Sequence, residues 1–406
     1  MTDEQMLQAP RGTRDFMPQE KIKRDWIVGT IKREFEKFGF NPLETPALEN
    51  FDVLSNKFAG GEEILKETYR LKDQGNRELG LRYDLTVPLC RIIASNNALA
   101  MPFKRYQIAS AWRDGPLKTG RYREFTQCDA DIVGVESLRA DAECVALTQS
   151  VFDALGLKVK MRVNNRKFLD GLLAKAGVPE SKRATVMLSI DKLEKIGRDG
   201  VERELKEKGV TVEILEVIKD AKPSREIGEL FSYCEELGVR KDFVVFDASL
   251  ARGLNYYTGT VFEGYLAGGK IKSSVCGGGR YDDLIAKFSG REQKIPAVGI
   301  SFGVDVIAEV AAEREKTVVQ AFLIPIKTTA RAIAIAQELR AQGVNCAVDL
   351  MERSISKNLD YASKQGIPFA IIVGEQELKA GKIKLRDLQS GEEKLVSVSE
   401  AAEIIG

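Results

Sequence analysis

The sequence predicts an α+β protein in which a domain built on an antiparallel sheet with flanking helices carries a helical insertion and is followed by a small α/β domain. Three observations support this prediction. Strand-like segments follow one another in pairs between residues 68 and 134, charged helical runs fill residues 166–238, and strands alternate with helices from residue 318 onward. The chain of 406 residues suits roughly two to three domains and can bury sizeable cores.

The first domain opens with a helix and two strand pairs. Residues 20–40 carry apolar side chains at helical spacing, which predicts a long amphipathic helix, and the prolines within 41–50 then favour an extended chain. Residues 68–86 read as a hairpin around the polar turn DQGNRE. A second strand pair, 103–114 and 123–134, surrounds a glycine-containing basic connection. The apolar positions of the helix are Ile22, Trp26, Ile27, Ile31 and Phe35.

The remainder of the first domain contains the insertion. Short charged runs such as DKLEKIG and DGVERELKEKG, with few strand signals, indicate a mainly helical insertion over about 166–238. Strand-like sequence returns at 243–266, and the glycine cluster CGGGRYDDL of 276–284 precedes an apolar run that continues into a helix. The charged stretch 311–317 is the best linker candidate, so we expect the first domain to span 1–316.

The second domain, expected over 318–406, begins with strand, helix, strand, helix and strand in alternation, ending at PFAIIVG. This alternation predicts an α/β domain of about 90 residues with a largely parallel sheet.

The composition excludes several classes of protein. Lys and Arg number 61 against 60 Asp and Glu, so overall charge does not indicate a nucleic-acid partner, which must meet a local patch instead. The six cysteines are far apart without a C-x-x-C pair, which fits neither a disulfide framework nor a zinc cluster. With no apolar signal segment and no run of about 18 apolar residues, we expect a cytoplasmic protein rather than a secreted or membrane-spanning one.

The chain contains no histidine. That absence excludes Ser-His-Asp and Cys-His triads, histidine-ligated metals and histidine general bases. Chemistry here must depend on arginine, carboxylates, hydroxyls or a bound cation. Phosphoryl or nucleotidyl transfer, which is driven by positioning and charge stabilisation, is the reaction class that best fits this restriction.

Basic side chains gather in the connection within the second strand pair. Such a loop can fold over polyphosphate, because each guanidinium donates two hydrogen bonds to phosphate oxygens and keeps its charge. A solvated hairpin tip is the commoner fate of a charged run and is the first choice for this segment in isolation. The residues are Arg113, Lys118, Arg121 and Arg123.

Two further segments are candidates for lining a ligand site. Arg252, Tyr256 and Tyr257 lie in an otherwise apolar strand context, where a buried arginine needs an anionic partner such as a phosphate. An edge strand with exposed tyrosines is equally compatible with that segment. The glycine run 277–279 permits close approach of backbone to a ligand, although a tight turn is the simpler explanation. It is neither a P-loop nor a full dinucleotide fingerprint.

The aspartates Asp84, Asp129 and Asp131 flank the second strand pair. They could hold an ammonium group or a cation. Acidic residues near strand ends are more often solvated, and the local sequence favours that interpretation.

The joint order of these motifs closely resembles the histidyl-tRNA synthetases, a family of class II aminoacyl-tRNA synthetases. The resemblance runs from RGTRDFMP at 11–18 to KLRDLQSGE near the carboxy terminus. NPLETPALEN resembles motif 1, with Pro46 as its proline, and WRDGPLKTGRYREFTQCDADIVG resembles motif 2 in the form common in archaeal and eukaryotic members. LARGLNYYTGTVFE and CGGGRYDDL resemble the two histidine-specific signatures, while IDKLEKIG and SISKNLDYASKQGIPFAIIVGEQEL match in the insertion and the anticodon-binding domain.

The resemblance implies a class II catalytic domain, a carboxy-terminal anticodon-binding domain and a two-step reaction. The carboxylate of histidine attacks the α-phosphorus of ATP to give histidyl-adenylate and pyrophosphate, and the adenylate then acylates the 3′ end of histidine tRNA. A carboxylate is already ionised at neutral pH, so the first step needs no general base. Mg²⁺ would accompany the β- and γ-phosphates, and the motif 1 region would form a homodimer.

The resemblance also implies roles for individual residues. Arg113 and Arg252 would be catalytic, contacting the α-phosphate from two sides and doing work that a metal ion does in many related enzymes. Histidine would be bound through its ammonium by Asp84, Thr86 and Gln127, and around its imidazole by Asp131, Tyr257 and Tyr281. Tyr256 would be a further histidine-binding residue. ATP would be bound by Arg113, Arg121, Arg123 and Arg252, and no side chain is assigned to a metal.

One departure from the family is Val306, which stands where motif 3 carries the arginine of G-x-x-R. Either another basic residue replaces it, or ATP affinity is weakened, or the chain is an inactive paralogue, which the retained Arg113, Arg252 and Gln127 disfavour. The principal alternative function is a catalytically impaired paralogue that senses histidine as a regulatory subunit of histidine biosynthesis. The family's known regulatory paralogues lack the anticodon-binding domain, which residues 318–406 supply here. An RNA-binding module without catalysis is a third interpretation.

Overall fold

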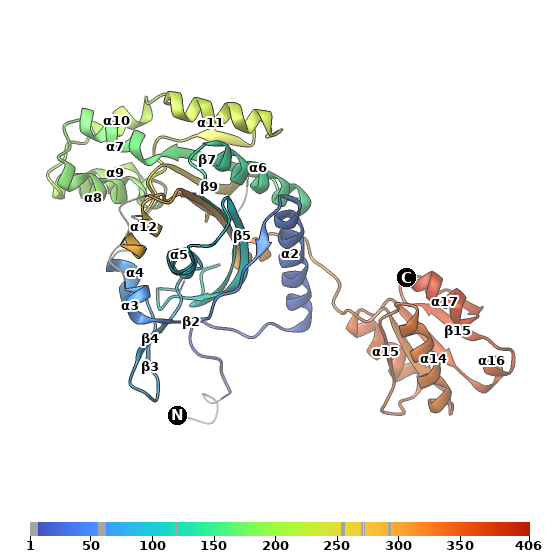
Figure 1. The fold of residues 1–406 in the computed structure, drawn as a ribbon. Coiled ribbons are helices and arrows are strands. Elements are labelled where there is room, and N and C mark those ends of the chain that lie inside the picture. Colours follow the sequence, from blue (N-terminus) through green and yellow to red (C-terminus); the bar gives the residue numbers. More distant parts are fainter. Residues whose placement is uncertain are drawn as a thin grey trace. The chain divides into compact units, whose positions relative to one another are not determined.

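The computed structural model describes residues 7–55, 62–117, 120–252, 256–268, 271, 273–290 and 294–406. The chain divides into two compact units (Figure 1). Unit 1 comprises Met1–Arg14 and Ile27–Ala311, and unit 2 comprises Asp15–Trp26 and Ala312–Gly406. Among the described residues, every helix is too short or too polar to span a lipid bilayer.

The main sheet of unit 1 has eight strands in the order β1-β5-β6-β11-β10-β9-β7-β8. Neighbours run antiparallel except at the two edges, where β1 with β5 and β7 with β8 are parallel. In that order the strands are β1 (Asn41–Pro42), β5 (Phe103–Trp112), β6 (Glu124–Val133), β11 (Ala297–Gly303), β10 (Cys276–Arg280), β9 (Thr260–Leu266), β7 (Val159–Asn165) and β8 (Val244–Phe246). The predicted antiparallel sheet and the pairing of 103–114 with 123–134 are confirmed.

A smaller antiparallel sheet completes the strands of unit 1. It has the order β2-β4-β3, formed by β2 (Leu48–Asn50), β4 (Glu78–Leu81) and β3 (Arg70–Lys72). The pairing of β3 with β4 confirms the hairpin predicted for residues 68–86.

Helices cover both faces of the main sheet. Ile27, Ile31 and Phe35 of α2 (Pro18–Lys37) are fully buried, as the helical spacing predicted, and Phe35 packs on Tyr106 of β5. Arg105, the preceding residue of β5, points to the opposite face and donates a hydrogen bond to the carbonyl of Leu85, directly before α5 (Thr86–Ser95). Accordingly α2 and α5 lie on opposite faces of the sheet (Figure 1). The other helices outside the segment after β7 are α3 (Phe51–Leu54), α4 (Glu62–Lys66), α6 (Arg139–Ala154), α12 (Leu284–Ser289) and α13 (Val304–Ala308).

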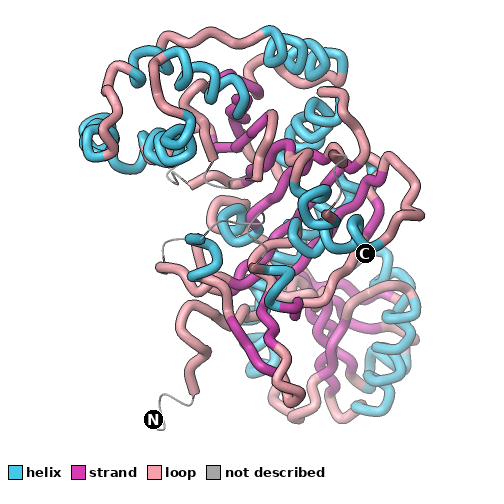
Figure 2. Tube along the Cα trace, turned by 60° about the vertical axis from the view of Figure 1, so that its left-hand side comes forward, coloured by secondary structure: helices cyan, strands magenta, loops and turns pink. Residues whose placement is uncertain are grey.

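A run of helices occupies the chain between β7 and β8. In both views these helices gather at the upper end of unit 1 (Figure 1, Figure 2). The first four of them share a core that includes Leu173, Val186, Val201 and Leu205, which apolar spacing along these helices supplies, whereas the last packs against α6. The helices are α7 (Arg166–Lys175), α8 (Glu180–Ile190), α9 (Leu193–Glu207), α10 (Ile214–Lys219) and α11 (Arg225–Glu236).

Unit 2 has a five-stranded sheet in the order β13-β12-β14-β15-β16. The first three strands are parallel, as the strand–helix alternation predicts, whereas β15 and β16 add an antiparallel extension. The extension was not expected; the connection from Asp387 to Glu393 is too short for the crossover that a parallel pair requires. The elements are β12 (Ala321–Pro325), α14 (Thr329–Ala341), β13 (Cys346–Val348), α15 (Ile355–Gln365), β14 (Phe369–Val373), α16 (Glu375–Lys379), β15 (Ile383–Asp387), β16 (Glu393–Val396) and α17 (Val398–Ile405).

Candidate active site

A cavity of about 1370 Å³ in unit 1 collects side chains from segments far apart in the sequence. Arg113 and Arg252, nominated separately from two motifs, both line it. The other nominated residues that line it are Asp84, Thr86, Arg121, Gln127, Asp129, Asp131, Tyr256, Tyr257, Gly277, Gly278, Gly279 and Tyr281.

Arg123 is the nominated residue that the structure places outside the cavity lining. Its guanidinium pairs with Asp114 at 2.9 Å, and its backbone N–H donates to the carbonyl of Gly12 at 2.8 Å. Arg123 therefore ties the basic connection to the amino-terminal segment. Lys118, the remaining basic residue of that connection, lies outside the described residues.

The polar face of β6 forms one wall of the cavity. Alternation along the strand points Gln127, Asp129 and Asp131 to the same side. The interpretation of the aspartates as solvated is wrong, because Asp84, Asp129 and Asp131 are each at most 5% exposed. Strands β5 and β11 flank β6 on both sides, and the start of α5 lies nearby, so the sheet interior rather than a strand end surrounds these carboxylates.

Asp131 is held from three directions. Arg105, fully buried and directly opposite it in the β5–β6 register, pairs with its Oδ2 at 2.7 Å. The Tyr281 hydroxyl donates to its Oδ1, and Gly299 in β11 leaves room for the carboxylate, which a Cβ at that position would overlap. Arg105 was not nominated from the sequence. Its place opposite Asp131 in the predicted strand pair was the signal that would have identified it.

Burial sets the protonation of the cavity wall. It raises the pKa of Asp129 to about 7, with Arg105 opposing the rise and Asp131 adding to it. Burial likewise raises the pKa of Asp84. The pKa values of Tyr257 and Tyr281 are also raised by burial, so both phenols stay protonated at neutral pH and remain able to donate hydrogen bonds.

Arg252 and the two tyrosines lie in the loop between β8 and β9, whereas the sequence had suggested a strand. Arg252 has a left-handed backbone with φ of 49°, and its Nη1 donates to the carbonyls of Phe262 at 3.3 Å and Gly278 at 3.5 Å. Tyr257 is 6% exposed and its ring packs 4.7 Å from that of Tyr256, which is partly buried. The alternative of exposed edge-strand tyrosines is therefore wrong. A strained backbone at a cavity residue is a frequent mark of a functional position.

The glycines of 277–279 form the strand β10 between β9 and β11, so the tight turn favoured from the sequence is wrong. Their role is to leave room. A Cβ on Gly277 would overlap the guanidinium of Arg252, and a Cβ on Gly278 would overlap the carbonyl oxygen of Gly299. Glycine lets a charged side chain lie directly on the sheet surface there.

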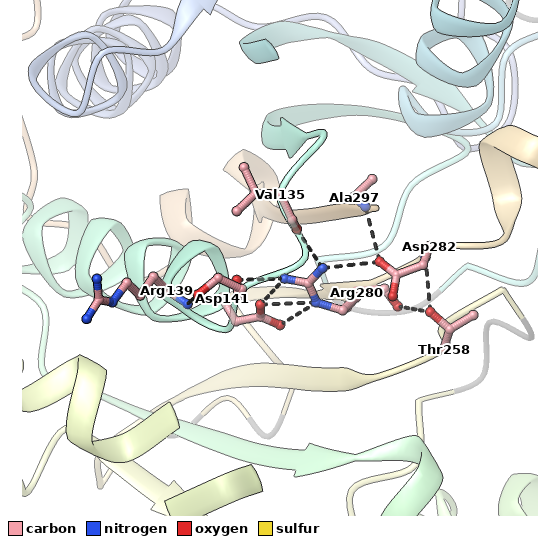
Figure 3. Close-up of polar contacts among 8 residues, drawn as sticks. Val135, Arg139, Asp141, Thr258, Arg280, Asp282 and Ala297 are labelled. Atoms are coloured by element: carbon pink, nitrogen blue, oxygen red, sulfur yellow. Dashed lines mark hydrogen bonds and ion pairs between the residues drawn. The ribbon is translucent and has the colours of Figure 1, made fainter. Parts of the chain in front are cut away.

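A buried ion-pair network fixes the end of β10 (Figure 3). Arg280 pairs with Asp141 of α6 and donates to the carbonyl of Val135 at 2.9 Å. The Asp282 carboxylate accepts hydrogen bonds from Arg280 at 3.2 Å and from the backbone N–H of Ala297. The backbone N–H of Asp282 donates to Thr258 Oγ1 at 3.0 Å. Tyr281 sits between these two anchored residues, so the network holds its backbone against the cavity.

The remaining nominated residues lie around the start of α5 and the basic connection. The Arg113 Nε donates to the carbonyl of Tyr83 at 3.0 Å, which directs its guanidinium beside Asp84, and it lies 5.1 Å from the Phe125 ring centroid. Asp84 Oδ1 accepts the backbone N–H of Thr86 at 3.2 Å. Arg121 is exposed at the cavity edge, where an anionic ligand can reach it.

Two further findings concern the segments around the site. Val306 lies outside the cavity lining and packs against Gly120, where a Cβ would lie 3.3 Å from the valine methyl group. Residues of α8, α9 and their connection also line the cavity, namely Leu188, Ile190, Asp191, Leu193 and Lys195. The chain after β7 thus supplies part of the wall, which the match of IDKLEKIG had not revealed.

The arrangement suits a ligand with anionic and cationic parts. Arg113, Arg121 and Arg252 offer fixed positive charge for phosphate oxygens, and Asp84, Asp129 and Asp131 offer buried acceptors. Among the described residues, Cys, Asp and Glu side chains form no group of three suited to a metal ion.

Comparisons with known proteins give a consistent result. A family model described as histidyl-tRNA synthetase matches residues 12–307, and one described as an anticodon binding domain matches residues 320–406. The chain is 41% identical to histidine–tRNA ligase 1 of Bacillus cereus, covering 96% of this chain and 97% of that protein. It is 40% identical to histidine–tRNA ligase 2 of Shouchella clausii, with 97% and 98% covered. The crystal structure of histidyl-tRNA synthetase from Nostoc sp. PCC 7120 superposes with a TM-score of 0.85 at 33% identity, covering 98% of each chain.

Proposed function

Because the chain belongs to the histidyl-tRNA synthetase family of class II aminoacyl-tRNA synthetases, we propose roles in that reaction for the residues that line the cavity. The activity is that of a histidine–tRNA ligase. Histidine is activated with ATP to histidyl-adenylate, and the histidyl group is transferred to the 3′ end of histidine tRNA. What we propose below is which side chains bind each substrate and which side chains stabilise the transition state.

Arg113 and Arg252 are proposed as the catalytic pair. As the carboxylate of histidine attacks the α-phosphorus, negative charge accumulates on the phosphoryl oxygens and pyrophosphate departs. Two guanidinium groups in one cavity can stabilise that charge without reorganising, and neither has a proton to shuttle. Arg252 is held by the carbonyls of Phe262 and Gly278 and by Gly277 beneath it, which fixes its position before ATP arrives.

Histidine recognition is proposed to divide between two ends of the β6 face. Asp84, Thr86 and Gln127 would bind the α-ammonium group. Asp131 would accept the N–H of the imidazole, since Arg105 holds this carboxylate in place. Burial raises the pKa of Asp131, and Arg105 opposes that rise. The neutral phenols of Tyr257 and Tyr281 would donate to the other ring nitrogen or close the pocket around it, with Tyr256 packing behind them. A site with such paired acceptors and donors rejects apolar side chains, which would leave buried polar groups unpaired.

ATP is proposed to lie along Arg113, Arg121 and Arg252. Arg121 reaches the edge of the cavity from the motif 2 connection, and it would take over the work of the arginine that Val306 replaces. Arg123 would act by holding this connection through Asp114 rather than by touching ATP. Mg²⁺ would be bound chiefly by the β- and γ-phosphates of ATP, where it neutralises the charge of the leaving pyrophosphate.

We also propose the division of labour along the chain. Residues 1–316 would form the catalytic domain, with the insertion at about 166–238, and residues 318–406 would bind the anticodon. The motif 2 form would be the one common in archaeal and eukaryotic members. A cytoplasmic homodimer that pairs through the motif 1 region around Pro46 is expected. The match of residues 320–406 to an anticodon binding domain favours the ligase over the histidine-sensing regulatory paralogue.

The convergence of Arg113 and Arg252 on one cavity is the observation that carries this proposal. The test is histidine-dependent exchange of pyrophosphate into ATP, which the ligase performs and which a regulatory subunit or a pure RNA-binding module lacks. Arg252→Ala should reduce exchange by about 100-fold or more, as loss of a preorganised charge donor does elsewhere, while the Kd for histidine changes little.

The matched control is Arg240→Ala, which removes an exposed arginine that pairs with Asp153. It should leave exchange unchanged. Near-normal turnover in Arg252→Ala, with a melting temperature like that of the wild type, would refute the assigned role.

A further inference from the structure

Three buried acceptor atoms on β6 have no hydrogen-bond donor among the described residues, and one of them, Asp131 Oδ2, is compensated by its ion pair with Arg105 at 2.7 Å. The other two are Gln127 Oε1 and Asp129 Oδ1, and both residues line the cavity. Asp129 is 3% exposed, so bulk water does not solvate its carboxylate. A buried carboxylate oxygen without a donor costs free energy, which a ligand with N–H donors would recover.

Asp129 lies among charged groups of both signs. From β5 it faces Arg105, from β6 Asp131, from the segment between β4 and α5 Arg82 and Asp84, and from β11 the hydroxyl of Ser301. Tyr257 reaches toward it from the loop before β9 but stays neutral. Arg105 is engaged through Nη2 with Asp131 and the carbonyl of Leu85, Arg82 donates to the carbonyls of Ser110 and Thr45, and Arg113 lies beside Asp84. Among the described residues none of these groups donates to Asp129 Oδ1, so a ligand that brings N–H donors into the cavity can supply the missing hydrogen bond.

The chemistry of the missing partner indicates an ammonium group. An ammonium carries one positive charge and three N–H donors, which matches unpartnered acceptors on two neighbouring side chains of one strand face. A divalent metal requires about six oxygen ligands, and no three metal-binding side chains cluster in the part of the chain that the structure describes. The imidazole end of histidine has its own acceptor in Asp131, which Arg105 and Tyr281 already orient.

We propose that Asp129 is a further specificity-determining residue, a direct ligand of the α-ammonium group of histidine next to Gln127. This inference rests on the proposed function for the identity of the amino acid. It adds a residue that the family resemblance did not assign, since Asp84, Thr86 and Gln127 were the expected ammonium ligands. The raised pKa of Asp129, about 7, adds a measurable consequence, because an incoming ammonium favours the ionised carboxyl and expels its proton.

The test compares two ligands and two variants by calorimetry. Asp129→Asn keeps the shape of the side chain and removes its charge, and it should weaken histidine binding by about 10- to 100-fold, the usual range for a buried charged hydrogen bond. Imidazole propionate, which is histidine without its ammonium group, should bind the wild type and the variant with affinities within about threefold. Proton release on histidine binding near pH 7, measured in two buffers of different ionisation enthalpy, should disappear in the variant.

The control variant is Asp170→Asn. Asp170 of α7 lies outside the cavity lining and is paired with Arg183 at 2.9 Å, so its loss tests whether removal of any carboxylate charge from the protein weakens binding. It should leave histidine affinity unchanged. Equal weakening of both ligands in Asp129→Asn would assign the residue to the imidazole or to folding, and unchanged histidine affinity would remove it from the site; either result overturns the proposal. Failure of the proposed function is seen separately, as absence of histidine-dependent exchange in the wild type.

Discussion

Replacing Asp129 by asparagine should stabilise the unliganded protein, and the gain should grow with pH. Asp129 is buried, and its pKa rises from 3.8 to about 7 in the folded state. Between these values only the folded state holds the proton, so unfolding releases it and a rise in pH favours unfolding. The stabilising contribution of the protonated carboxyl is thus complete below about pH 4 and lost as the pH rises through 7. Asparagine does not ionise and escapes this loss.

The size of the effect follows from the shift. At about 1.36 kcal/mol per pKa unit, the rise from 3.8 to about 7 corresponds to about 4 kcal/mol, of which about 3 kcal/mol falls between pH 5 and pH 7. For a folding unit of this size each kcal/mol moves the melting temperature by about 2 °C, so the Tm of Asp129→Asn should gain about 6 °C on the wild type between pH 5 and pH 8.

Thermal unfolding followed by circular dichroism, at intervals of half a pH unit, measures this difference directly. Effects of other titrating groups largely cancel between the two proteins. Saturating histidine should stabilise the wild type more than the variant at pH 8, because the bound ammonium pairs with the ionised carboxylate. Melting curves that stay parallel from pH 5 to pH 8 would show that Asp129 ionises normally in the folded state, and the electrostatic reasoning would be refuted.

Three further changes test the scaffold of the site. Gly277→Ala should displace the guanidinium of Arg252 and lower kcat for pyrophosphate exchange by about tenfold or more with little change in Tm; normal exchange would show that the guanidinium tolerates the Cβ. Asp141→Ala leaves Arg280 buried without its main partner and should lower the free energy of unfolding, measured in urea, by about 3–5 kcal/mol. A loss of less than about 1 kcal/mol, as expected for an exposed pair, would contradict this prediction. Arg105→Met should raise the KM for histidine by at least about tenfold while the KM for ATP changes little, and equal changes in both constants would contradict a role through the imidazole pocket.

The sequence predicted those elements whose local pattern agrees with their tertiary setting. Residues 103–114 and 123–134 pair in the structure because alternating apolar and polar side chains suit a sheet with one face toward the cavity. The helix over 20–40 was predicted because Ile27, Ile31 and Phe35 repeat at helical spacing and are all buried.

The failures have a common physical cause: long-range partners decided the local structure. Glycines 277–279 have low strand propensity, yet they form β10 because β9 and β11 pair with them on both sides. Arg252 and the backbone of Gly299 leave no room for a Cβ at Gly277 and Gly278. Arg252 was expected in a strand, but carbonyls of Phe262 and Gly278 hold it in a left-handed loop.

The prediction that the aspartates are solvated failed for a related reason. Local sequence does not reveal that Asp131 lies opposite Arg105 on the neighbouring strand, so its charge was taken to favour exposure to solvent. Cross-strand register, had it been applied to the predicted pair, would have brought these two residues together. The combined role proposed for Arg113 and Arg252 was accessible only through resemblance to a family, because no spacing rule joins residues so distant in the chain.

The glycine-lined strand β10 limits how the pocket can be re-engineered. A designer who wants room for a bulkier amino acid normally trims side chains, but Gly277, Gly278 and Gly279 leave nothing to trim on that floor. Enlargement must come from the tyrosines, where each truncation also removes a hydroxyl group. A side chain added at Gly277 or Gly278 would collide with the guanidinium of Arg252 or with the backbone of the neighbouring strand. Libraries aimed at new substrates are best concentrated on Tyr256 and Tyr257, with the three glycines held constant.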